Sequence, residues 1–214
     1  MQDKIIFYTH PWSRGRVTRW MLEECQANYQ TEVLEYDSSM KADTYLAINP
    51  MGKVPALKHG DTVFTENAAI CMYLADVFTD KQLAPPVGSK ARGTYYRWLL
   101  FVAGPLEAVA TAKSLKQLPE QLSEKERGQA GYGCLEDVVK TLEQSLAGIT
   151  YLCGDRFSTA DLYMTAYLNW YMQFDLIPKR PVFEQYVQQH INRPAALKAS
   201  EIDEALSKKY PVDF

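Results

Sequence analysis

Every strand-like segment of this 214-residue chain lies before residue 65. Strand patterning, with β-branched, aromatic or alternating apolar residues, is found at 4–8, 31–36, 54–57 and 62–64. Apolar residues recur at the helical spacing of three to four at 16–26, around 45–48 and at 67–78. The predicted order is β-α-β-α-β-β-α, so the first part of the chain is expected to form a small α/β domain.

Residues 79–90 interrupt this pattern with Pro85, Pro86 and Gly88, which are typical of a linker. Only helical patterns follow, at 95–109 with a possible bend at Gly104–Pro105, and at 124–146, 158–174, 181–189 and 194–207. We therefore predict an α/β domain over residues 1–79, a linker over 80–90 and an all-helical domain over 91–214.

The composition excludes several classes of protein. A hydrophobic fraction of 47% is enough for a substantial core, and a net charge of −3 gives no general attraction to nucleic acid or an anionic membrane. No run of about 18 apolar residues is present, and the apolar run after Lys4 is too short for a signal peptide. The four cysteines form no CxxC pair and the three histidines are scattered, so we expect a cytoplasmic protein with reduced thiols and no metal.

The turn after the first strand reads His10-Pro11-Trp12-Ser13. A thiol redox protein would carry Cys-Pro-x-Cys at this point, between a strand and a helix. Because no cysteine is present here, the chain itself cannot supply a redox thiol in this turn. Arg16 and Arg19, on the helix that follows, are expected to pair with acids rather than to act in catalysis.

A proline interrupts the strand pattern in NPMGKVPAL, residues 49–57. Since proline cannot donate to a sheet ladder, Pro55 requires an edge position, a turn or a cis bond. A cis bond would turn the main-chain groups of Val54 outward, where they could pair with an extended peptide ligand. A purely structural kink is the alternative.

The segment TENAAICMYLAD, residues 65–76, predicts a helix N-terminus at Asn67. Unpaired amides and the helix dipole favour a carboxylate there, and the neighbouring Glu66 could hold an ammonium group. The pair would then recognise the amino-acid end of a ligand. An ordinary capped helix is the alternative.

A third motif, GDRFSTADLYMTAYLNW at residues 154–170, has the spacing of a capping box between Ser158 and Asp161. Phe157 and Leu162 stand at the positions of a hydrophobic staple. We therefore predict a structural role for Asp161.

The three motifs, in this order and spacing, resemble the cytosolic glutathione S-transferase family, in particular its bacterial, theta-like, serine-type members. The resemblance covers nearly the whole chain. It implies a thioredoxin-like N-terminal domain followed by an all-helical domain, and a homodimer that takes part in detoxification. It also implies glutathione bound mainly in the first domain and a hydrophobic electrophile bound between the domains.

The resemblance implies a role for each motif residue. Pro55 would be cis, and the Val54 main chain would pair with the cysteinyl part of glutathione. Glu66 would meet the γ-glutamyl ammonium. Asn67 replaces the usual Ser or Thr at the γ-glutamyl carboxylate, which keeps the backbone amide and changes the side-chain donor. Lys53 is suited to the glycyl carboxylate, with a solvated surface lysine as the alternative.

Two hydroxyl groups compete for activation of the glutathione thiol. A free thiol titrates near pH 8.5, and one hydrogen bond to the thiolate, about 1.5–3 kcal/mol, lowers its pKa by roughly one to two units. Ser13 lies at the mouth of the first helix, where the dipole also favours an anion. Tyr8 ends the first strand, where tyrosine-type family members carry their catalytic tyrosine. We favour Ser13 and keep Tyr8 as the alternative.

The sequence leaves three functions open. The first is transfer of glutathione to an electrophile, with the acceptor received by some of the aromatic and apolar residues of one long helix: Tyr95, Tyr96, Trp98, Phe101 and Leu106. The second is a glutathione-dependent disulfide reductase or isomerase, in which the ligand supplies the sulfur. The third is a non-enzymatic binding or stress module with the same fold.

Overall fold

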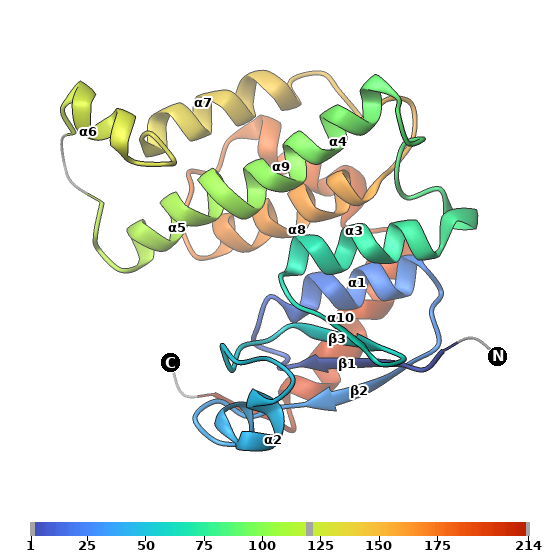
Figure 1. The fold of residues 1–214 in the computed structure, drawn as a ribbon. Coiled ribbons are helices and arrows are strands. Elements are labelled where there is room, and N and C mark those ends of the chain that lie inside the picture. The colour runs from blue at the N-terminus through green and yellow to red at the C-terminus, as the bar shows by residue number, and fades with distance from the viewer. Residues whose placement is uncertain (1–2, 119–121, 213–214) are drawn as a thin grey trace. The chain divides into compact units, whose positions relative to one another are not determined.

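The computed structural model describes residues 3–118 and 122–212. These residues form two compact units (Figure 1). One runs up to Gln82 and resumes at Arg193, and the other comprises Leu83–Asn192. The division between Gln82 and Leu83 falls inside the linker expected at residues 80–90.

The first unit is built on a four-stranded sheet in the order β2-β1-β3-β4. β1 (Ile5–Thr9) is parallel to β2 (Tyr29–Val33) and antiparallel to β3 (Ala56–His59), which pairs in turn with β4 (Thr62–Phe64). The second strand was expected at 31–36 and lies earlier, because its pairing with β1 begins at Tyr29 opposite Ile5. The parallel pair requires a crossover helix, which α1 (Gly15–Glu24) supplies.

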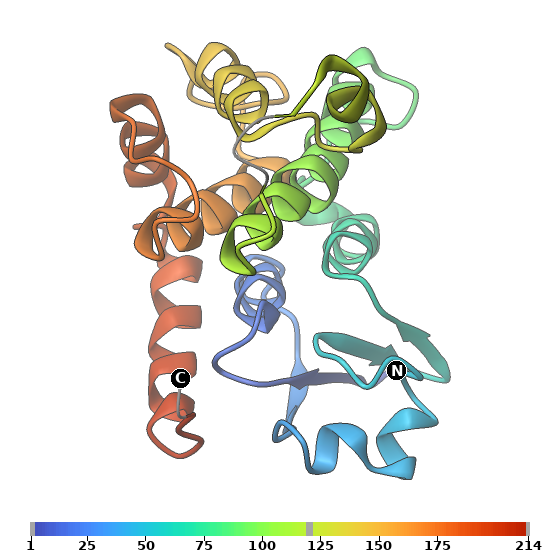
Figure 2. The same ribbon diagram turned by 90° about the vertical axis from the view of Figure 1, so that its left-hand side faces the viewer.

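Helices cover both faces of this sheet. α1 and α3 (Asn67–Val77) lie over one face, and α2 (Asp43–Leu46) lies over the other (Figures 1 and 2). Alternate residues of β1 are fully buried, including Phe7, whose ring lies 5.1 Å from the guanidinium of Arg19 on α1. Short 3₁₀ turns at Ser39–Lys41 and Thr79–Lys81 complete the unit. The predicted thioredoxin-like domain is confirmed.

The last helix, α10 (Pro194–Ser207), packs against α1 in this first unit. The sequence suggests a single helical domain over 91–214, whereas the structure groups residues from Arg193 onward with the sheet. The reason is electrostatic as well as apolar. Basic residues at the start of α1 face acidic residues near the end of α10, and acidic residues at the end of α1 face basic residues at the start of α10. Four ion pairs join them: Arg193–Glu24 at 2.6 Å, Lys198–Glu23 at 2.7 Å, Arg19–Asp203 at 2.7 Å and Arg16–Glu204 at 3.0 Å.

The second unit is entirely helical in its described residues. Its helices are α4 (Lys90–Phe101), α5 (Glu107–Ser114), α6 (Glu124–Gln129), α7 (Leu135–Leu146), α8 (Thr159–Gln173) and α9 (Pro181–His190). A π-helical segment, Val102–Leu106, joins α4 to α5 where a bend was expected, since Pro105 cannot donate to the helical ladder. The helix expected over 124–146 is divided into α6 and α7 near Gly133, which has a φ of +67°.

The start of α8 confirms the predicted capping box. The Asp161 carboxylate is fully buried and accepts hydrogen bonds from the Ser158 amide and hydroxyl, both at 2.8 Å. Its second oxygen accepts from the Leu152 amide at 2.7 Å and from the Tyr186 hydroxyl at 2.6 Å. Asp161 therefore ties the loop before α8 and the helix α9 to the start of α8.

None of the helices within residues 3–118 and 122–212 is long and apolar enough to cross a membrane.

Candidate functional site

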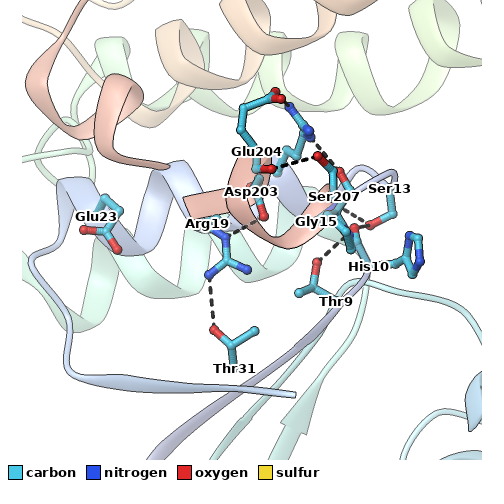
Figure 3. Close-up of polar contacts among 12 residues, drawn as sticks. Thr9, His10, Ser13, Gly15, Arg19, Glu23, Thr31, Asp203, Glu204 and Ser207 are labelled. Carbon is cyan, nitrogen blue, oxygen red and sulfur yellow. Dashed lines mark hydrogen bonds and ion pairs between the residues drawn. The ribbon is translucent and has the colours of Figure 1, made fainter. Parts of the chain in front are cut away.

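The turn between β1 and α1 is held by the Ser13 side chain. The Ser13 hydroxyl donates to the His10 carbonyl at 2.7 Å and accepts from the Gly15 amide at 3.0 Å (Figure 3). The Ser13 amide donates to the same His10 carbonyl at 3.0 Å. The Ser13 oxygen thus accepts from the first amide of α1, so the hydroxyl lies at a helix N-terminus, where an anion is favoured.

Other side chains fix the remaining backbone groups of this turn. Arg16 Nε donates to the Pro11 carbonyl at 2.6 Å, and its Nη1 pairs with Glu204 on α10. The Trp12 amide donates to His10 Nδ1 at 3.2 Å, while Tyr36 donates to the Trp12 carbonyl at 3.4 Å. The turn is therefore held in one conformation by contacts from its own residues, from α10 and from the loop after β2. The expected pairing of Arg16 and Arg19 with acids is confirmed.

Tyr8 lies near the same end of β1 but in a different environment. It packs against the apolar cluster of Met40, Tyr45 and Ala56, with its ring 5.6 Å from that of Tyr45 on α2. Burial raises the pKa of the Tyr8 phenol, and the Glu32 carboxylate raises it further. The structure thus places Tyr8 on the α2 side of the sheet as a neutral phenol, whereas Ser13 belongs to the turn that enters α1.

The peptide bond between Val54 and Pro55 is cis, as the resemblance implies. The preceding carbonyl, that of Lys53, accepts from the Tyr45 hydroxyl at 2.6 Å and from Asn49 Nδ2 at 2.8 Å. The Lys53 side chain itself is exposed. This part of the chain is anchored from α2, so the Val54 main chain stands at a fixed place beside the end of β1.

A second lysine near this segment, Lys41, makes a structural contact. Its Nζ donates to the Gly52 carbonyl at 2.8 Å and to the Met51 carbonyl at 3.2 Å. The Lys41 ammonium group therefore supports the loop before Val54.

Glu66 and Asn67, at the start of α3, differ in their exposure and in their contacts. Glu66 is exposed and has a φ of +64°. Asn67 is buried, and its side chain accepts from the Thr18 hydroxyl at 2.7 Å and donates to the Arg14 carbonyl at 2.9 Å. The Asn67 amide side chain thus links α3 to α1, so what it can offer a ligand is its backbone N–H. The part played by Thr18 carried no signal in the sequence.

Three segments meet at this end of the sheet. Tyr8 of β1 is paired in register with Ala56, next to the cis proline. The Arg14 carbonyl, in the turn before α1, is bonded to Asn67 at the start of α3. The arrangement brings together a hydroxyl at a helix N-terminus, an extended main chain, a second helix N-terminus and the exposed carboxylate of Glu66.

Exposure separates the aromatic residues of the long helix in the second unit. Tyr95, Trp98 and Leu106 are buried and belong to the core of this unit. Phe101 is half-buried, and Tyr96 is 41% exposed with its hydroxyl accepting from Arg92 Nε at 2.9 Å. Within the described parts of the chain, no three His, Cys, Asp or Glu side chains come close enough to hold a metal ion.

Two family models match the chain. Residues 11–77 match the model for the glutathione S-transferase N-terminal domain, and residues 116–194 match that for the glutathione S-transferase C-terminal domain. Both matches fall where the structure has the expected thioredoxin-like and helical parts.

Individual curated proteins named as glutathione S-transferases are also similar to this chain. The glutathione S-transferase GstA of Escherichia coli O157:H7 is 37% identical over 129 residues, which are 60% of this chain and 62% of that protein. This chain thus spans less than two thirds of GstA. Glutathione S-transferase F13 of Arabidopsis thaliana is 31% identical over 170 residues, 75% of this chain and 77% of that protein.

A solved structure extends the likeness over almost the full length. The glutathione transferase URE2P6 of Phanerochaete chrysosporium, in complex with oxidized glutathione, is 25% identical with a TM-score of 0.77. The likeness covers 96% of this chain and 98% of the other. Taken with the family models and the curated relatives, these matches show that the chain belongs to the glutathione S-transferase family.

Proposed function

We propose that the chain is a glutathione transferase, which activates the glutathione thiol by a hydroxyl hydrogen bond and conjugates it to a hydrophobic electrophile. The observation that carries the proposal is the meeting of the Ser13 turn, the Val54–Pro55 segment and the Glu66–Asn67 helix start. The names of the relatives and the glutathione complex of URE2P6 support it.

Each part of glutathione has a partner in this arrangement. The Val54 main chain pairs with the cysteinyl part, and Glu66 holds the γ-glutamyl ammonium. The Asn67 backbone N–H receives the γ-glutamyl carboxylate at the start of α3, where the helix dipole favours it. Lys53, whose side chain is exposed, meets the glycyl carboxylate.

Ser13 is the proposed donor to the thiolate. Its hydroxyl proton is directed at the His10 carbonyl, so it must rotate toward the sulfur when glutathione binds. A neutral hydrogen bond is worth about 1 kcal/mol and one to an anion about 1.5–3 kcal/mol, so the exchange is favourable. The Gly15 amide donates to the Ser13 oxygen and so strengthens it as a donor. Tyr8, a neutral phenol, is the alternative donor.

Two substitutions distinguish the donors. We expect Ser13→Ala to raise the pKa of the bound glutathione thiol by roughly one to two units, and Tyr8→Phe to leave it unchanged. The ultraviolet absorbance of the thiolate, titrated in the complex, measures this pKa. An unchanged thiol pKa in Ser13→Ala would show that Ser13 is not the donor and would favour Tyr8. Binding of S-methylglutathione, which has no thiol, separates loss of thiol activation from disruption of the turn by loss of the Ser13 contacts.

The acceptor is proposed to be an apolar electrophile, received in part by accessible aromatic residues of the helical unit such as Tyr96 and Phe101. The serine-type, theta-like subclass, a cytoplasmic homodimer and a role in detoxification belong to the same proposal. The alternatives are a glutathione-dependent disulfide reductase or isomerase and a non-enzymatic binding module.

One sequence of measurements tests these functions against each other. We expect the protein to be retained on glutathione resin and then to turn over a chromogenic aryl halide. Turnover of a glutathione mixed disulfide without turnover of the halide would indicate the reductase. Tight retention with no turnover of any electrophile or disulfide would indicate the binding module, and no retention would overturn the proposal.

A further inference from the structure

His10 supports the Ser13 turn through both its backbone and its ring. Its carbonyl accepts from the Ser13 hydroxyl and amide, and its ring Nδ1 accepts from the Trp12 amide at 3.2 Å. An acceptor at Nδ1 requires the neutral ring with its proton on Nε2. The turn in this conformation therefore depends on an unprotonated Nδ1.

The surroundings of the ring favour the neutral form. His10 is only 2% exposed, and its ring lies 4.5 Å from that of Tyr36 and 6.5 Å from that of Tyr210. Tyr36 belongs to the loop after β2, and Tyr210 follows α10. Burial lowers the pKa of His10, while the Glu35 carboxylate, in the same loop as Tyr36, opposes this shift.

Protonation of the His10 ring would turn its hydrogen bond with the Trp12 amide into a repulsive contact. An imidazolium ring has two N–H donors and no acceptor, so Nδ1–H would face the Trp12 N–H. The Trp12 carbonyl is held separately by Tyr36, so the peptide groups on the two sides of Trp12 are fixed by different partners. Loss of the Nδ1 contact would leave the Pro11–Trp12 peptide group held on its carbonyl side alone, by Arg16 Nε, and would loosen the turn just before Ser13.

We propose that His10 is a positioning residue for thiol activation: its unprotonated Nδ1 holds the Trp12 amide and so keeps the Ser13 hydroxyl in place, and its protonation releases the turn. The effect on thiol activation rests on the proposed function, whereas the contact between His10 Nδ1 and the Trp12 amide does not. Because its pKa is lowered, His10 binds fewer protons in the ordered turn than in the released turn. The ordered turn is therefore fully favoured above about pH 6.5, the usual pKa of histidine, and is progressively lost as the pH falls below that value.

Two variants separate the acceptor from the ring. His10→Asn keeps an acceptor for the amide two residues on, as in an Asx turn, and does not titrate. His10→Phe keeps an aromatic ring between Tyr36 and Tyr210 and removes the acceptor. His59→Asn is the matched control, because His59 bonds to Tyr73 and pairs with Ile5 at the other end of β1.

The first measurement follows the Trp12 amide by NMR in the protein without ligand, between about pH 5 and 8. We expect this amide to titrate together with the His10 ring in the wild type and in His59→Asn, and not in His10→Asn. A Trp12 amide that does not follow the His10 titration in the wild type would overturn the inference, whether or not the protein binds glutathione.

The second measurement is the affinity for S-methylglutathione over the same range. We expect progressively weaker binding toward the acid end in the wild type, because the ordered turn that binds the ligand requires the neutral His10 ring. Binding should be independent of pH in His10→Asn and weak at every pH in His10→Phe. Equal pH dependence in the wild type and His10→Asn would contradict the role of His10. If neither the wild type nor any variant bound S-methylglutathione at any pH, the proposed function itself would be rejected.

Discussion

Gly15 lies beside Thr9 (Figure 3), and a Cβ atom placed on Gly15 would lie 2.0 Å from the hydroxyl oxygen of Thr9. It would also lie 3.0 Å from the Ser13 hydroxyl oxygen and 3.1 Å from Thr9 Cβ. The Thr9 side chain at the end of β1 therefore lies so close to the start of α1 that any side chain at the first helical position would clash with it. Gly15 permits this approach because it lacks a side chain.

Gly15→Ala is expected to destabilise the protein by about 1–3 kcal/mol, because the buried Thr9 side chain or the turn itself must shift to relieve the clash. It should also weaken glutathione binding, since the new Cβ crowds the Ser13 hydroxyl as well. Gly93→Ala is the control. Gly93 lies within α4 with open space around it, so alanine there should stabilise by about 0.5–1 kcal/mol. Thermal unfolding measures both, and a Gly15→Ala protein as stable as the wild type would contradict the close approach.

Replacing the buried carboxylate of Asp161 tests the start of α8. Asp161→Asn turns one oxygen into an amide group that faces existing donors, so we expect a loss of about 3 kcal/mol. Asp155, whose side chain is 93% exposed, provides the control, and Asp155→Asn should change stability by less than about 0.5 kcal/mol. Chemical unfolding of the two variants gives the comparison. Equal stabilities would mean that the four hydrogen bonds to Asp161 contribute little.

The local patterns of the sequence were sufficient for the type and order of nearly all the elements. The helix at 194–207 is one example, since its predicted bounds agree with α10. Its location was not predicted, because the partners of its charged residues lie on α1, about 180 positions earlier in the chain. A periodic pattern shows that a helix has an apolar face, but not which surface that face will cover.

The candidate site was predictable to a similar degree. The motifs around Val54–Pro55 and Glu66–Asn67 pointed to the segments that meet at the end of β1. The use of the Asn67 side chain was not predictable, because its partners Thr18 and Arg14 are brought near it only by the packing of α3 on α1. The ring contact of His10 was missed for a local reason, since sequence alone does not show which ring nitrogen a turn will use.

The buried pair of Arg19 and Asp203 should be the strongest single link between α1 and α10. Their side chains are 1% and 2% exposed, so removing one leaves an uncompensated buried charge. We expect Arg19→Met or Asp203→Leu alone to cost about 3–5 kcal/mol, and the double variant to cost less than either. A double-mutant cycle by chemical unfolding measures the coupling.

The exposed pair of Arg16 and Glu204 provides the comparison for this cycle. Glu204 is 59% exposed, so its attraction to Arg16 is screened by water and should contribute no more than about 1 kcal/mol. Glu204→Gln should accordingly leave the unfolding midpoint nearly unchanged. If Asp203→Leu were as mild as Glu204→Gln, the two helices would be held together mainly by apolar contacts.

The four cysteines should differ sharply in their reactivity toward a thiol reagent. Burial raises the pKa of Cys25 and of Cys153 to about 12, and it raises that of Cys71 as well. At pH 8 a thiol with a pKa of about 12 is thiolate in only about one part in ten thousand. Cys134, at the start of α7, is only partly buried.

We therefore expect one thiol to react rapidly in the native protein and all four to react after denaturation. Cys134→Ser should abolish the rapid phase, whereas Cys25→Ser should leave it intact. For the three buried thiols, raising the pH toward 12 increases the thiolate fraction. Reaction should therefore accelerate with pH in the Cys134→Ser protein. A rapid phase that survives in Cys134→Ser at pH 8 would show that a second thiol is accessible.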